Sequence, residues 1–177
     1  MSLDPSGQLK MFADVTPSQL VEQLSSIDAA LGPQRAAGAF PWRSASKAGL
    51  VLDIGSDWPG TFDGTAASTV SPLHNMAEAV ARTAVDRDNP PPGWRTGEAL
   101  TVDEAILAYT LHPAMAAREE NSKGSITPGK LADLVVLAAD IRKLPPTQIA
   151  HTSVLYTFLG GKIVYDGKTT SHPAPTH

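Results

Sequence analysis

The segment from Ile54 to Pro59, IGSDWP, holds the residue whose type and position most suggest chemistry. Its Asp57 follows a short apolar run at 50–54 that is typical of a buried strand. A carboxylate just beyond the C-terminal end of a buried strand lies where α/β proteins place their active sites. There it can bind a metal ion or take a proton from water. The alternative is that Asp57 only caps the turn that follows, which is a common role of aspartate.

The five histidines are the other candidate ligands. No two of them have the H-x-H or H-x-x-x-H spacing, and a mononuclear zinc site usually needs three protein ligands. We therefore interpret them as solvated or helix-capping side chains. They are His74, His112, His151, His172 and His177.

Other patterns that mark catalytic or nucleotide-binding sites are missing. The chain has no cysteine, which excludes disulfides, thiolate zinc sites and cysteine nucleophiles. It has neither a G-x-S-x-G elbow nor a G-x-G-x-x-G loop. The stretch GSITPGK at 124–130 resembles a P-loop only faintly, because no Ser, Thr or helical pattern follows it. Trp42, Trp58 and Trp94 could line a pocket, but packing in the core or in loops is the favoured interpretation.

Composition narrows the class of protein. The 177 residues include 14 Lys and Arg against 18 Asp and Glu, which argues against a nucleic-acid partner. The apolar runs are far shorter than the roughly 20 residues that a membrane helix needs, and no signal-peptide pattern is visible. The 42% of hydrophobic residues is enough for a real core. We expect a cytoplasmic protein that binds neither nucleic acid nor membrane.

The elements that must position Asp57 can be placed from caps and apolar spacing. Helices are predicted to begin at Thr16, Pro41, Ser71 and Thr101. The first is expected to run to the Gly-Pro pair at 32–33, with Thr16 and Gln19 as its capping box. The fourth is expected to break or kink at Pro113.

The character of the sequence changes after Gly124. Apolar runs at 134–137 and 154–159 predict strands, and a Gly-Gly pair at 160–161 predicts a hairpin turn into a third strand at 162–165. The chain therefore looks α/β up to about residue 123 and β-hairpin-like after it.

Several segments resemble those of the amidohydrolase superfamily, in its amidohydrolase 3, or YtcJ-like, branch. The stretch at 124–137, GSITPGKLADLVVL, is similar to the segment that leads in this superfamily from the last barrel helices into a small β-sandwich. The stretch GGKIVY at 160–165 resembles the final hairpin of that sandwich, and GSDWP at 55–59 resembles the segment after barrel strand eight. The similarity covers about residues 12–167.

This resemblance implies an α/β fold made of the last strand or strands and helices of a (β/α)8 TIM-type barrel. A β-hairpin segment of a composite β-sandwich would follow. The chain would then divide into the C-terminal part of a metal-dependent hydrolase domain at 1–123, the C-terminal part of the sandwich at 124–168, and a flexible tail at 169–177. The barrel would be incomplete.

The resemblance also implies an activity, the metal-dependent hydrolysis of an amide-type C–N bond in a small molecule. Asp57 would be both a metal ligand and the catalytic base. The superfamily's other ligands would lie upstream of residue 1, and His74 and His112 match none of its ligand positions. We therefore expect a divalent metal, zinc by preference, in a longer parent protein, and weak or absent metal binding in this chain.

An unclosed barrel has a further consequence. One or two strands cannot bury themselves by closing a barrel, and the sandwich segment would keep open edges. We expect the chain to form a homo-oligomer or to associate with a missing N-terminal part. The alternative function is a non-catalytic oligomerisation or interaction module derived from the same fold.

Overall fold

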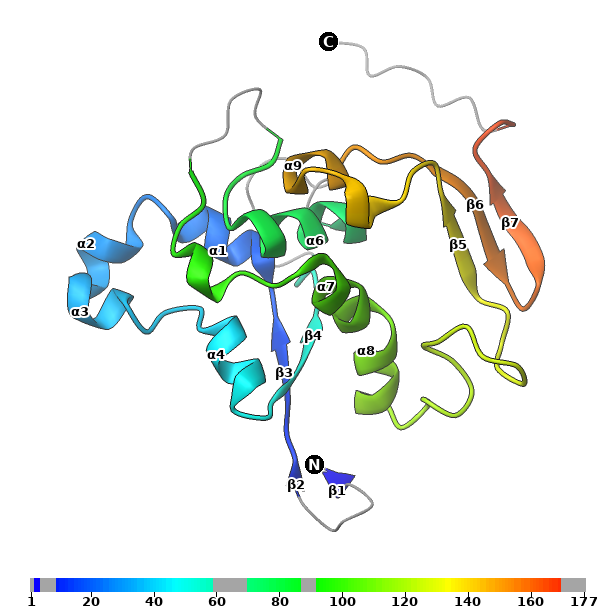
Figure 1. Cartoon of the computed structure of the whole chain (residues 1–177), viewed down its shortest axis with the longest axis horizontal. Coiled ribbons are helices and arrows are strands. Elements are labelled where there is room, and N and C mark those ends of the chain that lie inside the picture. Colours follow the sequence, from blue (N-terminus) through cyan, green and yellow to red (C-terminus); the bar gives the residue numbers. More distant parts are fainter. Residues whose placement is uncertain (1, 4–8, 59–69, 87–91, 170–177) are drawn as a thin grey trace.

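Two parallel strands, surrounded by short helices, form the part of the structure that carries Asp57 (Figure 1). The computed structural model describes residues 2–3, 9–58, 70–86 and 92–169. The helices are α1 Pro17–Gln23, α2 Ile27–Leu31, α3 Pro33–Ala36, α4 Trp42–Lys47, α6 Pro72–Ala81, α7 Val102–Tyr109, α8 Leu111–Ala116 and α9 Pro146–Ile149, with 3-10 turns η1 Thr96–Glu98 and η2 Ile141–Lys143. The strands are β1 Ser2–Leu3, β2 Leu9–Lys10, β3 Phe12–Val15, β4 Val51–Ile54, β5 Leu134–Leu137, β6 Val154–Leu159 and β7 Lys162–Asp166.

The two faces of the β3–β4 sheet differ sharply. The strands pair in parallel from Phe12 with Val51 to Val15 with Ile54. Successive side chains on a strand point to opposite faces. Ala13, Val15, Leu52 and Ile54 share the face that packs into the hydrophobic core, together with α6 and α7. The other face carries Asp14 and Asp53, which lie directly opposite one another.

β3 is an element that the sequence did not predict. Its four residues, FADV, contain only two large apolar side chains, and Ala13 and Asp14 separate them, so no apolar run marks the strand. β4, in contrast, lies where the apolar run predicted a strand. β3, which the sequence analysis did not predict, is the strand that pairs with β4.

The first predicted helix is divided into α1 and α2, which corrects the single helix expected from Thr16 to Gly32. A turn occupies 24–26, where Ser26 bonds through its hydroxyl to the Gln23 carbonyl at 3.4 Å. Serine competes in this way for backbone groups and weakens a helix interior. Gly32, with φ of 73°, then ends α2 and precedes α3.

The caps predicted at Ser71 and Thr101 are confirmed. The Ser71 hydroxyl accepts a hydrogen bond from the backbone amide of His74 at 3.4 Å. Thr101 and Glu104 form a complete capping box. The predicted break is also present, but it falls at Thr110 rather than at Pro113, which lies inside α8. A proline clashes with the carbonyl four residues before it, so the helix ends just ahead of its first turn.

A buried cation joins α4, the end of α6 and the segment that contains η1. Arg82 is fully buried in a left-handed conformation with φ of 52°. Its guanidinium lies 4.7 Å from the Trp42 ring centre and 5.4 Å from that of Trp94. It donates to the carbonyls of Trp94 at 2.8 Å and Glu98 at 3.3 Å. Trp42 and Trp94 therefore serve packing, as expected, whereas the side chain of Trp58 is 61% exposed.

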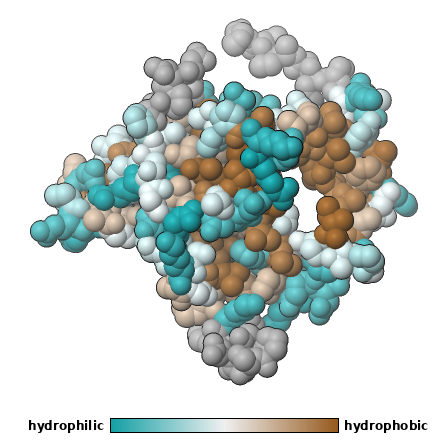
Figure 2. All heavy atoms as spheres, in the orientation of Figure 1, coloured by the Kyte–Doolittle hydropathy of each residue, from teal (hydrophilic) through white to brown (hydrophobic). Residues whose placement is uncertain are grey.

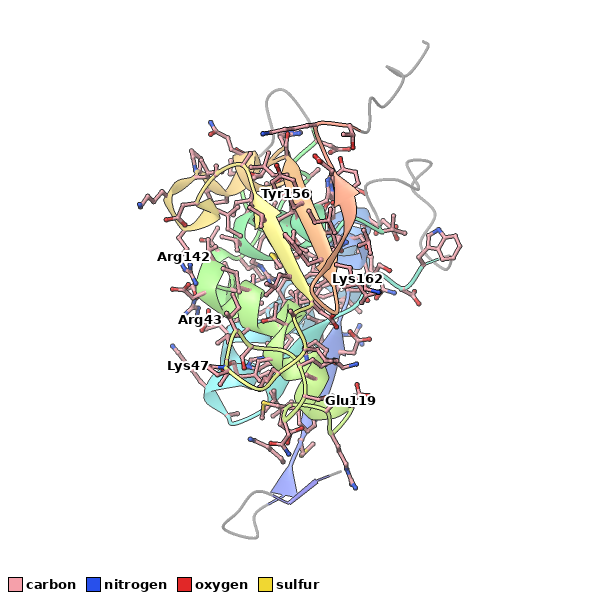
Figure 3. All side chains as sticks on the ribbon, turned by 90° about the vertical axis from the view of Figure 1, so that its right-hand side faces the viewer. Arg43, Lys47, Glu119, Arg142, Tyr156 and Lys162 are labelled. Carbon is pink, nitrogen blue, oxygen red and sulfur yellow. The ribbon has the colours of Figure 1, made fainter. Side chains whose placement is uncertain are left out.

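A second tie holds α4 against the start of α7. Arg43, on α4, donates to the Ala99 carbonyl at 2.9 Å and to the Glu104 carboxylate at 3.3 Å (Figure 3). These bonds and the Arg82 cluster fix the helices that cover the core face of β4.

The predicted strands of the C-terminal part form a separate antiparallel sheet in the order β5-β6-β7 (Figure 1). Gly160 and Gly161, both with positive φ, make the turn between β6 and β7, as the Gly-Gly pair predicted. In the part of the chain that the structure describes, no helix is long and apolar enough to cross a membrane. The expected tail, 169–177, lies outside the described residues from position 170 onward.

Candidate active site

Asp57 lies just beyond the C-terminal end of β4, as the sequence predicted. The Gly55 amide extends the parallel ladder by donating to the Val15 carbonyl at 3.1 Å. Two residues later Asp57 takes a left-handed conformation with φ of 53°, and its side chain is exposed. The Trp58 amide closes the turn by donating to the Ser56 hydroxyl at 3.2 Å. A non-glycine residue with positive φ is uncommon and marks a position whose backbone is held in place.

The Asp57 carboxylate has a partner from the neighbouring strand's loop. Gln19 donates from Nε2 to Asp57 Oδ2 at 3.0 Å, although the two residues are 38 positions apart. Gln19 lies in the first turn of α1, directly after β3. Because parallel strands end at the same edge of a sheet, the loops after β3 and β4 are neighbours.

The contact with Gln19 corrects the predicted capping box. The Thr16 side chain makes no cap bond, and the Gln19 side chain reaches Asp57 instead of the Thr16 amide. Pro17 occupies the first helical position and has no N–H to be satisfied, which reduces the need for a cap. The signal that could have revealed the contact, a parallel partner strand before Gln19, was the unpredicted β3.

Two further carboxylates make this edge of the sheet negative. Asp14 and Asp53 face one another across β3 and β4, on the face opposite to the core. Burial, chiefly, and the nearby charges of Asp53 and Asp57 raise the pKa of Asp14, while backbone amides of Gly55 and Val15 act against the rise. Like charges directly opposite one another on a sheet repel, so a cation would be attracted to this edge.

Two of the described histidines are engaged inside the protein. His74 is buried on α6, where its Nε2 lies 3.2 Å from the carboxylate of Glu78. His112 Nδ1 lies 2.6 Å from the Leu52 carbonyl of β4. The expectation of solvated or capping side chains is therefore wrong for these two, because each binds a group inside the protein. His151 is exposed, as expected, whereas His172 and His177 lie outside the described residues.

The ability of these residues to hold a metal ion can be judged from the donors. Within the described ranges, no three His, Asp or Glu side chains are grouped so that they could bind a metal ion. Asp57 uses Oδ2 to accept the Gln19 bond, and a carboxylate has lone pairs on both oxygens. The described residues thus fit a divalent cation as one ligand, not as a complete site.

Comparison with known proteins gives a consistent picture. A sequence model described as the amidohydrolase family matches residues 2–165. The protein Long After Far-Red 3 of Arabidopsis thaliana is 32% identical over 160 residues, which is 90% of this chain and 26% of that protein. The putative amidohydrolase YtcJ of Bacillus subtilis is 29% identical over 93% of this chain and 30% of its own. An N-substituted formamide deformylase of Arthrobacter pascens is 35% identical over 72% of this chain and 21% of its own.

Solved structures of similar fold agree with the sequence matches. Enamidase, a member of the amidohydrolase superfamily, aligns with a TM-score of 0.52 and 16% identity over 99% of this chain and 48% of its own. Guanine deaminase of E. coli aligns with a TM-score of 0.53 and 20% identity over 89% of this chain and 34% of its own. The chain spans about a quarter of the length of the curated relatives above, at 26%, 30% and 21%.

Proposed function

The chain belongs to the amidohydrolase family, and from this premise we propose that it is the C-terminal part of a metal-dependent hydrolase. The reaction would cleave a C–N bond, other than a peptide bond, in a small amide-type molecule. Support comes from the relative named as an N-substituted formamide deformylase, with 35% identity over 127 residues. An N-substituted formamide is therefore the first substrate class to test.

The observation that carries this proposal is the position of Asp57. Its carboxylate stands at the C-terminal end of β4, on a backbone held at positive φ, beside the loop that follows the adjacent parallel strand. Parallel α/β sheets bind their ligands at this end. An exposed carboxylate there can reach a substrate bound above the sheet.

Asp57 would act as a metal ligand and as the general base. A divalent metal, which we propose to be zinc, supplies an activated water and polarises the substrate carbonyl when it is bound. Asp57 accepts the proton of the attacking water on its carboxylate and passes it to the leaving nitrogen. Asp14 and Asp53 would add negative potential that favours a cation at this edge.

The same premise assigns the two sheets. We propose that β3 and β4 are the last two strands of a (β/α)8 barrel, and that β5-β6-β7 is the C-terminal part of a composite β-sandwich. The corresponding domain boundary is the one expected near residue 124. The outer edges of β3 and β4 would pair with strands of an N-terminal part.

The first test compares the activity and the zinc content of the 177-residue chain with those of the full-length protein. We expect the full-length protein to hydrolyse an N-substituted formamide, such as N-butylformamide, when zinc is added. Hydrolysis should stop when a chelator removes the zinc. The 177-residue chain should show background turnover only and substoichiometric zinc by elemental analysis, since a catalytic zinc site uses about three protein ligands.

Two results would contradict this expectation. Stoichiometric zinc with turnover in the isolated chain would mean that this chain holds a complete site. Full-length protein that stays inactive on amide-type substrates with zinc, manganese and cobalt would exclude the proposed reaction.

A non-catalytic interaction module is the second candidate, and one observation favours it. Several large apolar side chains of the β5-β6-β7 sheet and the segment before it are exposed, and Figure 2 shows apolar residues gathered over this region. The sheet also carries Tyr156 (Figure 3), whose ring centre lies 6.3 Å from that of Phe158. Exposed apolar side chains that gather on a surface mark interaction sites, and here they lie on both faces of the sheet, since Val135 and Val136 are neighbours on β5. The exposed residues are Ile126, Leu131, Val135, Val136, Leu159, Ile163 and Val164.

This surface predicts self-association of the isolated chain. Sedimentation at micromolar concentration should show dimers or larger species, since burial of apolar area favours them. Val136 and Ile163 pair with Tyr156 and Phe158 and therefore share one face of the sheet. Replacing both by threonine should shift the distribution toward monomer, whereas the same change at the buried Ile149 should unfold the chain. A well-folded monomer at all concentrations would contradict the prediction.

A further inference from the structure

The contact between Gln19 and Asp57 joins two loops that the sequence keeps far apart. The register that pairs Val15 with Ile54 brings the first turn of α1 beside the turn at 55–58. The Gln19 side chain is half-buried there and donates to Asp57 Oδ2 at 3.0 Å. Ordering a long glutamine side chain costs conformational entropy, and the hydrogen bond to Asp57 must offset that cost.

The backbone around Asp57 depends on several ties. The Gly55 amide is bound to the Val15 carbonyl and the Trp58 amide to the Ser56 hydroxyl. Between these two ties, Asp57 keeps a positive φ of 53°, which is costly for a residue with a β-carbon. Among the described residues, Gln19 is the one that bonds to the Asp57 side chain itself, and this bond orients the carboxylate.

The chemistry of the donor also fits. Asp14 and Asp53 make the edge negative, and a lysine or arginine in place of Gln19 would neutralise Asp57 and compete with a cation. The NH2 group of a side-chain amide donates hydrogen bonds without adding charge. It engages Oδ2 and leaves the other oxygen, Oδ1, as the atom that can face a ligand or a proton.

We propose that Gln19 is a positioning residue that orients the Asp57 carboxylate for proton transfer through Oδ1. This inference rests on the proposed function of Asp57. It adds a residue from the neighbouring loop to the catalytic arrangement. Gln19 acts through the Asp57 carboxylate and not directly on water or substrate.

The first part of the test requires no activity. In the ¹⁵N-labelled 177-residue chain, the side-chain amide resonances of Gln19 are identified by their loss in Gln19→Leu. We expect them to move in Asp57→Asn, because the charged acceptor of the bond becomes a neutral amide oxygen. Those of Gln23, exposed on the same helix, should stay in place. Unmoved Gln19 resonances would overturn the positioning role, whatever Asp57 does.

The second part separates positioning from a merely structural contact. In the full-length protein acting on N-butylformamide, Gln19→Leu should lower kcat about ten-fold with KM changed less than about two-fold. Gln19→Glu, with the same shape but a negative charge toward Asp57, should lower kcat further. The control Gln23→Leu should leave both constants and the thermal midpoint unchanged.

The outcomes are distinguishable. If Gln19→Leu keeps the wild-type kcat while Asp57→Asn abolishes turnover, the positioning role is wrong and the proposed function stands. If Asp57→Asn keeps full turnover, the proposed function fails, and the inference about Gln19 fails with it.

Discussion

Asp57→Asn is expected to lower kcat of the full-length protein by a factor of about 10² to 10⁴, which is the usual range for the loss of a general base. Asparagine has the same shape and tolerates the left-handed backbone that Asp57 adopts at φ of 53°. The side-chain oxygen can still accept the Gln19 bond. The loss would therefore report the missing basicity of the carboxylate and not a change of fold. Steady-state kinetics on N-butylformamide with zinc provides the measurement.

A matched control makes the result specific. Asp86 is exposed, and Asp86→Asn makes the same change of charge elsewhere on the chain. It should leave kcat within about two-fold of wild type. Bound zinc, measured by elemental analysis, should fall only in part in Asp57→Asn if other ligands exist in the full-length protein. Wild-type turnover in Asp57→Asn would exclude Asp57 as the base.

Arg82→Ala is expected to lower the free energy of unfolding by about 2–5 kcal/mol, because two carbonyls lose their donor and each buried group left unsatisfied costs about 1–3 kcal/mol. The change leaves the carbonyls of Trp94 and Glu98 without their donor and empties the space between two tryptophan rings. Burial lowers the pKa of Arg82 to about 10, so the group stays charged at neutral pH. Urea unfolding followed by circular dichroism and tryptophan fluorescence gives the value.

The chain offers a control with the same residue type and backbone. Arg118 also has a positive φ, at 61°, but its side chain is exposed. Arg118→Ala should cost less than about 1 kcal/mol. Arg82→Lys keeps the charge but loses the planar fork that serves two carbonyls, so it should lie between wild type and alanine. Equal effects of Arg82→Ala and Arg118→Ala would show that the buried cluster contributes little.

The C-terminal sheet shows what sequence patterns can predict. The strands β5, β6 and β7 and the Gly160-Gly161 turn lie where the apolar runs and the glycine pair placed them. Each strand holds a run of large apolar residues, and the turn is set by its own residues. The caps of α6 and α7 were also predictable, because Ser71 and Thr101 bond to groups three residues ahead. The same pattern failed at Thr16, because the Gln19 side chain bonds to Asp57 instead.

The surroundings of Asp57 show where such patterns fail. The place of Asp57 after a buried strand was predicted, but its partner was not. In β3 the two large apolar residues, Phe12 and Val15, are separated by Ala13 and Asp14, so no apolar run marked it as a strand. Because β3 was not predicted, its parallel register with β4 was unknown. The contact between Gln19 and Asp57, 38 positions apart, depends on that register and could not be predicted. A contact set by strand pairing is a property of the tertiary structure.

The close approach of β3 to the start of the Asp57 loop constrains how this chain can diverge. A β-carbon at Gly55 would come within 2.9 Å of both carboxylate oxygens of Asp14 and 3.3 Å of its Cγ. Any larger residue at position 55 must therefore displace the Asp14 side chain from the amides of Gly55 and Val15 that it faces. Positions 14 and 55 are therefore an epistatic pair, in which a larger residue at 55 costs less once position 14 has lost its carboxylate. Mutational paths that change position 14 first avoid the displacement of its side chain.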